Sequence, residues 1–450
     1  MNIAMIHYRV GETDGVSLEM DKWRKILEKN GHTVHYIAGS EGTSQAHVIP
    51  QLYYRDEYDA MINDELFERL TLTEEELKER VIALSDTIEK QFVDIFKEHD
   101  IELIIPNNVL ALGRSPHIAM ALTRAATKTG VKVIGHHHDF YWERENYRHP
   151  QTDFTSMLLD TYFPPLALED MQHVVINIPA QRDLLENKGK ESTIVPNVLD
   201  FDQAPWVVDD YNSSYKQDMG IGDNEIVFLQ ATRVTNRKAI ELAIDLMATL
   251  NEPEYRKRLM GKTLYNGKTF TEETQLVMAM VGMHEGGNGY EKKLIQHAKE
   301  KGVRVIVKPE LIDHARHMVD GHKVYSLFDA YVHCDIITYP SIYEGWGNQF
   351  IEGIFAKKPQ IVFEYSVFES DIMAFGFDYI SLGNTYETME NGLATVSREI
   401  LERAADDTIA MLTDGARYQA CVEKNYEIAE RELSLDALER LVLGILGEVQ

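Results

Sequence analysis

The chain is 450 residues long and carries 45 Lys and Arg against 73 Asp and Glu, a formal net charge of −28. This length predicts two domains that each bury a core, and the acidic balance argues against a general nucleic-acid or anionic-membrane surface. The two cysteines, the short uncharged first strand in place of a signal peptide, and the lack of an apolar run of ~20 residues favour a cytoplasmic protein without membrane insertion.

Strands and helices alternate along the whole chain, which predicts an α/β fold with parallel sheets. The strands expected in the first half are 3–7, 33–38, 103–106, 132–136 and 174–178, and those in the second half are 225–230, 275–281, 303–307, 334–339, 360–363 and 379–381. A polar stretch between the two sets is typical of a linker. We therefore expect an N-terminal domain of residues 1–210, a C-terminal domain of residues 211–429, and a final apolar helix at about 430–450.

The loop after the first expected strand is rich in glycine and leads into a helix that begins near Ser17. Gly11 and Gly15 allow a close approach of the backbone, and the amides at a helix start can hold a phosphate. The spacing is neither that of the dinucleotide fingerprint nor that of a P-loop. Gly15 is therefore a donor-phosphate candidate, with a plain turn as the alternative.

Three consecutive histidines, His136 to His138, end a strand of the first half and precede Asp139. Consecutive residues of a strand point to opposite faces, so three adjacent histidines do not readily bind one ion, and we predict no metal site here. His138 and Asp139 are candidates for ligand contact at the strand end. For His136 and His137 the competing interpretation is a polar loop with satisfied imidazoles.

Three arginines of the first half fall in loops that follow expected strands: Arg114, Arg144 and Arg148. Guanidinium groups bind carboxylates and phosphates by paired hydrogen bonds. The three are candidates for binding a small anionic acceptor, although each alone is typical of a surface position.

A cluster of cations, Arg233, Arg237 and Lys238, lies on the loop that follows the first strand of the second half. Cations at the start of a helix oppose the helix dipole, an arrangement that makes sense if an anion binds there. A solvated basic turn is the alternative. Farther along, Gly282 and His284 follow another strand, where a ligand can approach a glycine loop or where the glycines simply make a turn.

The most informative block runs from Glu344 to Glu352, two carboxylates separated by a loop that contains Gly345 and Gly347. A buried strand precedes the block and another follows it, so Glu344 is expected in a strand-to-helix loop and Glu352 inside the helix. In an open parallel sheet, that loop lies at the edge where ligands bind.

This block resembles the Glu-x7-Glu signature of the retaining, nucleotide-sugar-dependent glycosyltransferases of group 1, a family that includes sucrose synthases. The resemblance implies two facing Rossmann-like domains of the GT-B type with the active site in the cleft between them. It also implies that the last helix packs on the first domain. Where members often read Glu-Gly-Phe-Gly-Leu, this chain has Trp346 and Asn348, so the identity of the donor sugar is open.

The resemblance also assigns roles to residues. Glu344 would lie near the donor sugar, Glu352 would accept hydrogen bonds from the ribose, and Arg233 with Lys238 would grip the diphosphate. His138 would lie on the acceptor side of the donor sugar. The remaining donor-site candidates are Gly345, Trp346, Gly347, Asn348, Gly15, Gly282 and His284.

At finer grain, residues 346–350 and 363–371 resemble mannosylglucosylglycerate synthases and their relatives, which make compatible solutes. We therefore expect a retaining transfer of a hexosyl unit from a nucleoside-diphosphate sugar to a small, soluble, anionic acceptor of the glucosylglycerate type. GDP-mannose ranks slightly above UDP-glucose as donor. No cofactor or metal is expected, and a homo-oligomer is left open. The alternatives are a phosphorylase- or epimerase-like enzyme on the same scaffold and a non-catalytic subunit that binds sugar nucleotides.

Overall fold

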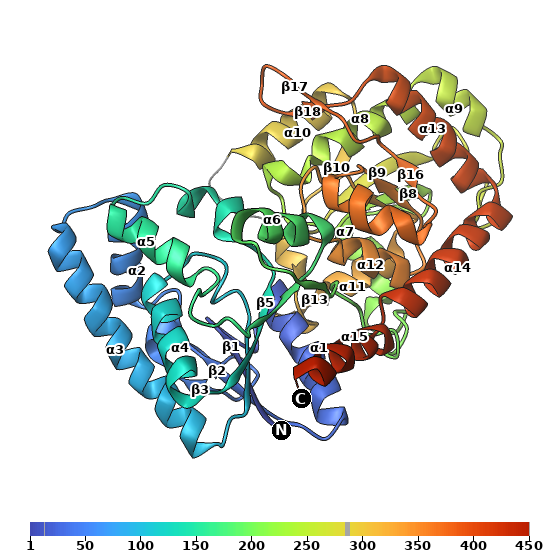
Figure 1. The fold of residues 1–450 in the computed structure, drawn as a ribbon. Helices are drawn as coiled ribbons and strands as arrows, with labels where there is room; N and C mark the ends of the chain where they lie inside the picture. The colour runs from blue at the N-terminus through green and yellow to red at the C-terminus, as the bar shows by residue number, and fades with distance from the viewer. Residues whose placement is uncertain (13, 284–288, 450) are drawn as a thin grey trace. The chain divides into compact units, whose positions relative to one another are not determined.

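The computed structural model describes residues 1–12, 14–283 and 289–449 (Figure 1). The chain forms two compact units. Unit 1 comprises Met1–Asn197 and Leu435–Gln450, and unit 2 comprises Val198–Ser434. The division therefore precedes the boundary expected at residue 210, and the last helix, α15 (Leu435–Val449), is part of unit 1.

Unit 1 is built on a sheet of seven strands in the order β3-β2-β1-β4-β5-β6-β7, with parallel pairing throughout. The strands are β1 (Asn2–His7), β2 (Thr33–Ala38), β3 (His47–Val48), β4 (Leu103–Pro106), β5 (Lys132–His137), β6 (Gln172–Val175) and β7 (Thr193–Ile194). All five expected strands are present. The last of these lies earlier than expected because Asn177 caps the helix α6 (Ile178–Lys188).

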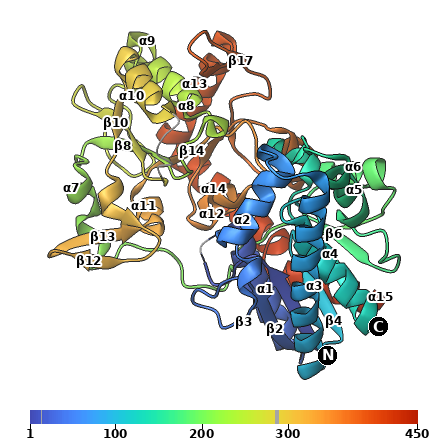
Figure 2. The ribbon, with the colours of Figure 1, turned by 90° about the vertical axis from the view of Figure 1, so that its left-hand side faces the viewer.

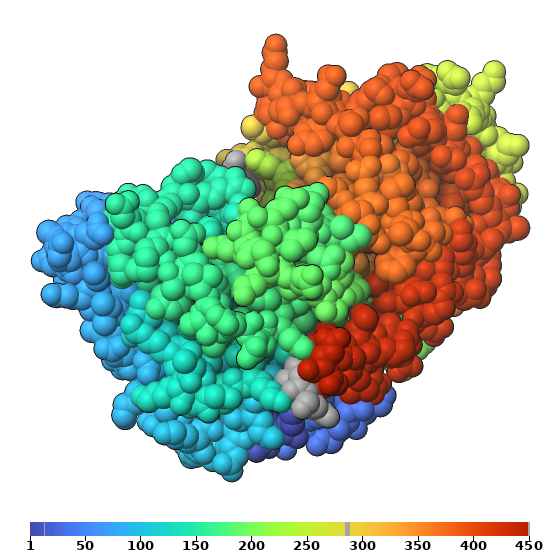
Figure 3. Space-filling model, viewed as in Figure 1, coloured from blue at the N-terminus to red at the C-terminus, as the bar shows by residue number. Residues whose placement is uncertain are grey.

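The helices of unit 1 each bury apolar side chains. They are α1 (Gly15–Lys29), α2 (Glu57–Asn63), α3 (Glu74–Glu98), α4 (Pro116–Thr129), α5 (Asp153–Tyr162), α6 and α15. Thr73 and Glu76 form a capping box that starts the long helix α3, and α3 packs on α4. The helix α15 packs on α1, and Figure 3 shows the red C-terminal segment beside the blue N-terminal one on the surface of unit 1.

Unit 2 contains a six-stranded sheet in the order β10-β9-β8-β14-β15-β16, again with parallel pairs. Its strands are β8 (Glu225–Gln230), β9 (Gln275–Met280), β10 (Arg304–Ile306), β14 (Ile336–Tyr339), β15 (Gln360–Val362) and β16 (Ile380–Ser381). The principal helices are α7 (Tyr215–Met219), α8 (Ile240–Leu250), α9 (Pro253–Leu259), α10 (Tyr290–Glu300), α11 (Leu327–His333), α12 (Asn348–Phe355), α13 (Arg398–Thr413) and α14 (Gly415–Glu432).

A small sheet of β11 (Ile312–Asp313), β13 (His322–Ser326) and β12 (His317–Val319) also belongs to unit 2, with the hairpin of β17 (Glu387–Thr388) and β18 (Ala394–Thr395). The sequence analysis did not predict these short strands. Among the described residues, no helix combines the length and the apolar character needed to cross a bilayer.

Both sheets follow the strand order of a Rossmann fold, which confirms the predicted class of two Rossmann-like domains. In this order the first three strands succeed one another towards one edge of the sheet and the later strands towards the other edge, so the strand order reverses between the first and the fourth strands. Ligands bind at the carboxyl ends of the two strands that flank this reversal. The relevant loops are those after β1 and β4 in unit 1 and those after β8 and β14 in unit 2.

Candidate functional site: a carboxylate between two cations

The loops after β8 and β14 meet in an ion cluster centred on Glu344. Its Oε2 accepts a hydrogen bond from Arg237 Nη1 at 2.6 Å, and its Oε1 accepts one from Lys238 Nζ. The side chain of Lys238 is 4% exposed and that of Glu344 is 10% exposed, whereas Arg237 is 44% exposed. Lys238 and Glu344 thus form a buried ion pair, and Arg237, which also binds Glu344, is exposed to solvent.

Local backbone geometry explains how Lys238 comes to point inward. A short 3-10 turn over Asn236–Lys238 is followed by Ala239 in the left-handed region, with φ +42°, and only then does α8 begin. The amide of Ile342 donates to the carbonyl of Arg237 at 2.9 Å, which ties the two loops together. The ammonium of Lys238 also lies 5.8 Å from the ring centre of Tyr339 at the end of β14.

The cluster carries an excess of positive charge. Burial lowers the pKa of Lys238, the Glu344 carboxylate opposes this shift, and the charges of Arg237 and Arg233 add to it. Arg233 is exposed in the same loop. Two of these cations, Arg237 and Lys238, share the one carboxylate of Glu344 at the edge of the sheet where a Rossmann-like fold binds its ligand.

A glycine holds a third loop against this site. A Cβ atom on Gly282 would lie 1.7 Å from the carbonyl oxygen of Thr232, so the loops after β8 and β9 touch through their backbones. The amide of Val234 also donates to the carbonyl of Met283 at 3.0 Å. Gly282 thus has a packing role in this structure, and His284 lies outside the described residues.

Glu352 lies on α12, in the helix that follows Glu344, as the sequence predicted. Its Oε2 accepts a hydrogen bond from the hydroxyl of Tyr331 at 2.8 Å. Tyr331 belongs to α11 and is fully buried, whereas Glu352 is half-buried. Tyr331 therefore fixes one carboxylate oxygen of Glu352.

The residues between the two glutamates form the turn into α12. Gly345 lies in the loop, Gly347 precedes the helix, and Asn348 is its first residue. Tyr365 donates a hydrogen bond to the carbonyl of Trp346 at 2.7 Å, and the indole of Trp346 is buried, with 6% of the residue exposed. Trp346 thus supports the turn from within the core of unit 2.

In unit 1 the loop after β1 is also rich in ionic contacts. Asp14 caps α1 by accepting hydrogen bonds from the amides of Val16 and Ser17 at 3.1 and 3.2 Å. Arg9 pairs with Asp14 at 3.2 Å and with Glu12 at 3.0 Å. The helix that Gly15 begins is therefore capped by the chain's own carboxylate.

His138 directly follows β5 and lies against the loop after β4, one of the two switch-point loops of unit 1. Its Nε2 is 3.1 Å from Asn107 Oδ1, and its amide donates to Asn108 Oδ1 at 2.7 Å. Burial lowers the pKa of His138 to about 4, so the imidazole is neutral at physiological pH. The rings of His136 and His138 lie 4.1 Å apart, while His137 contacts His173 at 3.1 Å. The three histidines thus alternate between faces, as a strand requires.

The three arginines proposed for the acceptor each have a different partner. Arg114 binds Asp59 at 3.0 Å and the carbonyl of Tyr54 at 2.7 Å. Asp59 is fully buried, so Arg114 balances a charge of the interior.

Nearer the end of β5, Arg144 pairs with Asp139 at 2.5 Å and Asn108 donates to the other oxygen of Asp139 at 3.3 Å. Arg148 donates to the carbonyl of Trp142 at 2.6 Å. Asp139 and Arg144 therefore remain at the strand end beside His138, whereas Arg114 is occupied by a structural ion pair.

Sequence reasoning gave Arg237, Tyr331 and the two asparagines no role. Arg237 stood in the cation cluster but was passed over for its neighbours. Asn107 and Asn108 directly follow a predicted strand, which was an available signal. Nothing in the sequence marks Tyr331, because it lies on α11 and contacts Glu352 of α12 only in the folded structure.

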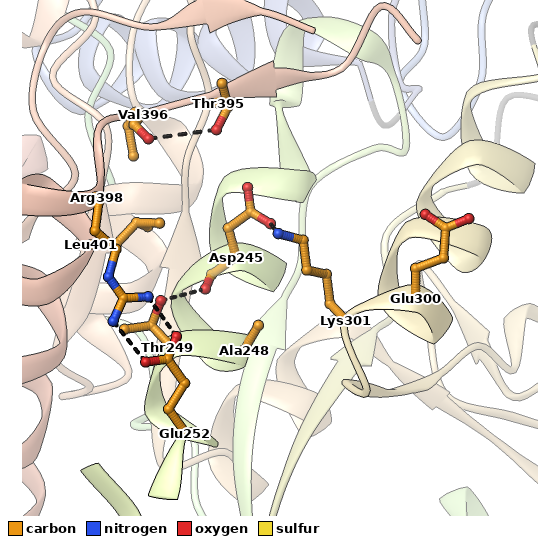
Figure 4. Close-up of a pocket in the computed structure, with 10 residues that line it drawn as sticks. All are labelled: Asp245, Ala248, Thr249, Glu252, Glu300, Lys301, Thr395, Val396, Arg398 and Leu401. Carbon is orange, nitrogen blue, oxygen red and sulfur yellow. Dashed lines mark hydrogen bonds and ion pairs between the residues drawn. The ribbon is translucent and has the colours of Figure 1, made fainter. Parts of the chain in front are cut away.

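A hollow of about 450 Å³ in unit 2 lies elsewhere, among α8, the end of α10 and the start of α13 (Figure 4). Its polar residues pair with one another: Arg398 binds Glu252 at 2.5 Å, and Lys301 approaches Asp245 at 3.5 Å. None of the sequence-predicted site residues lines it. We assign it no part in catalysis.

Two units with the strand order of a Rossmann fold are the architecture of the GT-B glycosyltransferases. The sequence model of "Glycosyl transferases group 1" matches residues 212–423, and the chain belongs to this family.

Mannosylglucosylglycerate synthase from Petrotoga mobilis is 40% identical over 414 residues, covering 92% of this chain and 94% of that protein. The enzyme of the same name from Thermotoga maritima is 38% identical over 457 residues, covering 98% and 99%. Among solved structures, sucrose-phosphate synthase from Thermosynechococcus elongatus superposes with a TM-score of 0.58 at 14% identity, covering 100% and 99% of the two chains, which bears on the fold alone.

Proposed function

We propose that the chain transfers a mannosyl unit from GDP-mannose to an acceptor of the glucosylglycerate type, with retention of the anomeric configuration. The names of the two relatives support the product class. The observation that carries the proposal is the cluster of Glu344 with Lys238 and Arg237, in which two cations meet one carboxylate. A site with more cations than carboxylates suits the negative diphosphate of a nucleotide sugar.

In this proposal the cations stabilise the leaving group. The bond from the anomeric carbon to the diphosphate oxygen breaks, and negative charge grows on the phosphate that Lys238, Arg233 and Arg237 would neutralise. The new bond forms to the acceptor hydroxyl, whose proton passes to the departing phosphate oxygen. The carbon is attacked from the face that the leaving group vacates, which accounts for retention.

The ion pairs of Glu344 favour this route over a covalent intermediate. A carboxylate that accepts hydrogen bonds from both Arg237 and Lys238 is a weakened nucleophile. We assign Glu344 to orienting the sugar and stabilising the positive charge of its transition state. Glu352, fixed by Tyr331, is assigned to the ribose hydroxyls, and Gly345 and Asn348 to the donor edge of the loop.

On the acceptor side we propose His138, Asp139 and Arg144, which meet at the end of β5. The neutral imidazole of His138 can exchange hydrogen bonds with a sugar hydroxyl, and Arg144 is half exposed and could bind a carboxylate. Arg148, also half exposed, is a second cation for the same anion.

The test offers GDP-mannose, UDP-glucose and ADP-glucose with glucosylglycerate, glycerate, a neutral disaccharide and a lipid acceptor. We expect product only with an anionic small acceptor, fastest with GDP-mannose, and an α-linkage by proton NMR of the isolated product. A β-linked product would refute retention, and preferential transfer to the lipid or the neutral sugar would refute the acceptor class. Binding of GDP-mannose without turnover would favour the non-catalytic alternative.

A further inference from the structure

Three histidines from three separate elements of unit 1 converge at one point, far along the sheet from His138. His35 lies on β2, His47 on the edge strand β3, and His99 directly follows α3 (Figure 2 shows the three elements). One ring nitrogen from each lies within 4.8 Å of the other two. All three side chains are half-buried, so the cluster is reachable from solvent yet held by its surroundings.

Sheet register accounts for the convergence. Ile37 of β2 pairs with His47 of β3, and His35 lies two residues before Ile37, so His35 and His47 share one face of the sheet. The ring centre of His99 is 4.2 Å from that of His47 and 4.9 Å from that of His35. The end of α3 thus sets the third imidazole over the pair.

The spacing is that of a metal site. With metal–nitrogen bonds of roughly 2.0–2.1 Å, two nitrogens of a tetrahedral site lie about 3.3 Å apart. His35 Nδ1 and His47 Nε2 are 3.2 Å apart. The ring nitrogen of His99 lies within 4.8 Å of the nitrogens of His35 and His47. A movement of this nitrogen by about 1.5 Å or less, through rotation of the side chain, would bring it to the tetrahedral separation.

The charged neighbours of the cluster act on a bound cation in both senses. Neutral imidazole is the form that ligates a metal. Among the charged neighbours, Arg24 opposes a cation, while Glu98 and the negative end of the α3 dipole attract one.

We propose that His35, His47 and His99 form a binding site for one divalent transition-metal ion, with Zn²⁺ the best fit, and that water completes its coordination. Three imidazoles select such ions over Mg²⁺ and Ca²⁺, which prefer oxygen ligands. This inference is independent of the proposed function.

The ion would act as a clamp on the edge of unit 1. β3 is only two residues long and follows a segment whose backbone binds the loop after β1, through Gly42 to Val10 at 2.8 Å and Thr43 to Gly11 at 2.9 Å. A metal that joins β3 to β2 and α3 would therefore stabilise this segment as well. We assign the ion a structural role and no step in transfer.

The full-length protein, stripped with chelator and dialysed, is titrated with Zn²⁺ by calorimetry and with Co²⁺ by visible absorption. We expect one equivalent per chain, the intense visible bands of a four-coordinate Co²⁺, and a rise of the thermal midpoint of unit 1 by about 5–11 °C at a free Zn²⁺ concentration ~100 times the Kd. His47→Asn and His99→Gln should each weaken binding at least about tenfold.

The matched control is the double variant His314→Gln, His317→Gln, which removes two exposed histidines beside Asp313 in unit 2. Binding that survives in this control and is lost in His99→Gln supports the site. Binding that is lost in the control and kept in His99→Gln overturns it, as does wild-type protein that takes up no ion or gives only the weak bands of six-coordinate Co²⁺. Circular dichroism of His47→Asn and the wild-type Co²⁺ spectrum keep the test decisive if His99→Gln misfolds.

Discussion

The loop after β1 in unit 1 and the loop after β8 in unit 2 occupy equivalent places in two Rossmann-like sheets, yet they carry opposite charge. In unit 1, Arg9 faces Glu12 and Asp14, a sum of 1 − 2 = −1. In unit 2, Arg237 and Lys238 face the single carboxylate of Glu344, a sum of 2 − 1 = +1. The two loops occupy the same place in the fold and differ in the charges of their side chains.

The two helix starts differ in the same sense. Asp14 uses its carboxylate to satisfy the first amides of α1, so an incoming phosphate would meet a negative charge there. At α8 the amide of Ile240 donates to the neutral hydroxyl of Tyr290 at 2.9 Å, and Lys238 and Arg237 precede the helix. The loop after β1 in unit 1 therefore disfavours a phosphate, whereas the loop after β8 in unit 2 favours one.

The largest effect should come from removing the central cation of unit 2. Lys238→Met should lower turnover by about 10³-fold, because one charge-stabilising group typically contributes 10²–10³ and the buried Glu344 also loses its partner. Binding of free GDP should weaken at least about tenfold, as measured by calorimetry. Arg9→Met is the matched control from unit 1, and we expect GDP affinity within about twofold of wild type. Equal GDP affinity in Lys238→Met and wild type would show that the cations of the unit 2 loop do not determine where the diphosphate binds.

The imidazole of His138 in unit 1 is neutral, whereas the cluster around Glu344 in unit 2 is charged, and a pH experiment tests this contrast. The pKa of His138 falls from 6.5 in the unfolded chain to about 4 in the folded protein, because the ring is buried. The unfolded state therefore binds the proton first, and stability is lost as pH falls from 6.5 towards 4. The loss is at most about 3 kcal/mol, from 1.36 kcal/mol for each pKa unit.

The free energy of unfolding, measured in urea between pH 4 and 8, should therefore fall towards acid more steeply in wild type than in His138→Gln. Equal slopes would show that His138 is not held neutral. Proton NMR of the ring gives an independent reading, since its resonances should not shift between pH 8 and pH 5.

The two glutamates of unit 2 should separate binding from turnover. Glu352→Ala should weaken GDP-mannose binding about tenfold, because hydrogen bonds to a charged partner contribute roughly 1.5–3 kcal/mol, whereas Glu344→Ala should mainly lower kcat. Tyr331→Phe tests whether fixing one oxygen of Glu352 matters, and we expect a smaller loss of donor affinity in the same direction. Unchanged donor affinity in Glu352→Ala would remove its assigned role.

The smallest effect concerns the cap in unit 1. Asp14→Ala should lower the free energy of unfolding by about 1 kcal/mol, the usual contribution of a helix N-cap. GDP affinity should stay unchanged, because the phosphate is assigned to unit 2. If Asp14→Ala instead gains a second GDP site, the charge of Asp14 alone prevents the loop after β1 from binding a diphosphate.

Prediction from sequence succeeded where the signal was local and failed where partners were distant in the chain. Alternating strands and helices predicted parallel α/β architecture, and the block around Glu344 pointed to the family, whose resemblance implied two Rossmann-like domains. The two-residue strands β3 and β7 carry too little pattern to be recognised.

The site shows the same limit. The basic loop was found because its cations are adjacent, but the pairing of Lys238 with Glu344 spans 106 residues and that of Arg114 with Asp59 spans 55. Arg114 seemed available for a ligand because its buried partner could not be seen. The sequence shows where a charged residue stands, but its counter-ion can be identified only from the folded structure.

The return of the chain to unit 1 through α15 has a consequence for biosynthesis. Residues 1–197 leave the ribosome well before α15, whose Leu438 and Val442 are fully buried in the finished protein. At ~5–20 residues per second, the delay is roughly 10–50 s. During this interval the nascent first half exposes the apolar surface of α1 that α15 later covers. The domain that is begun first is thus completed last, and this window is when the chain most depends on chaperones.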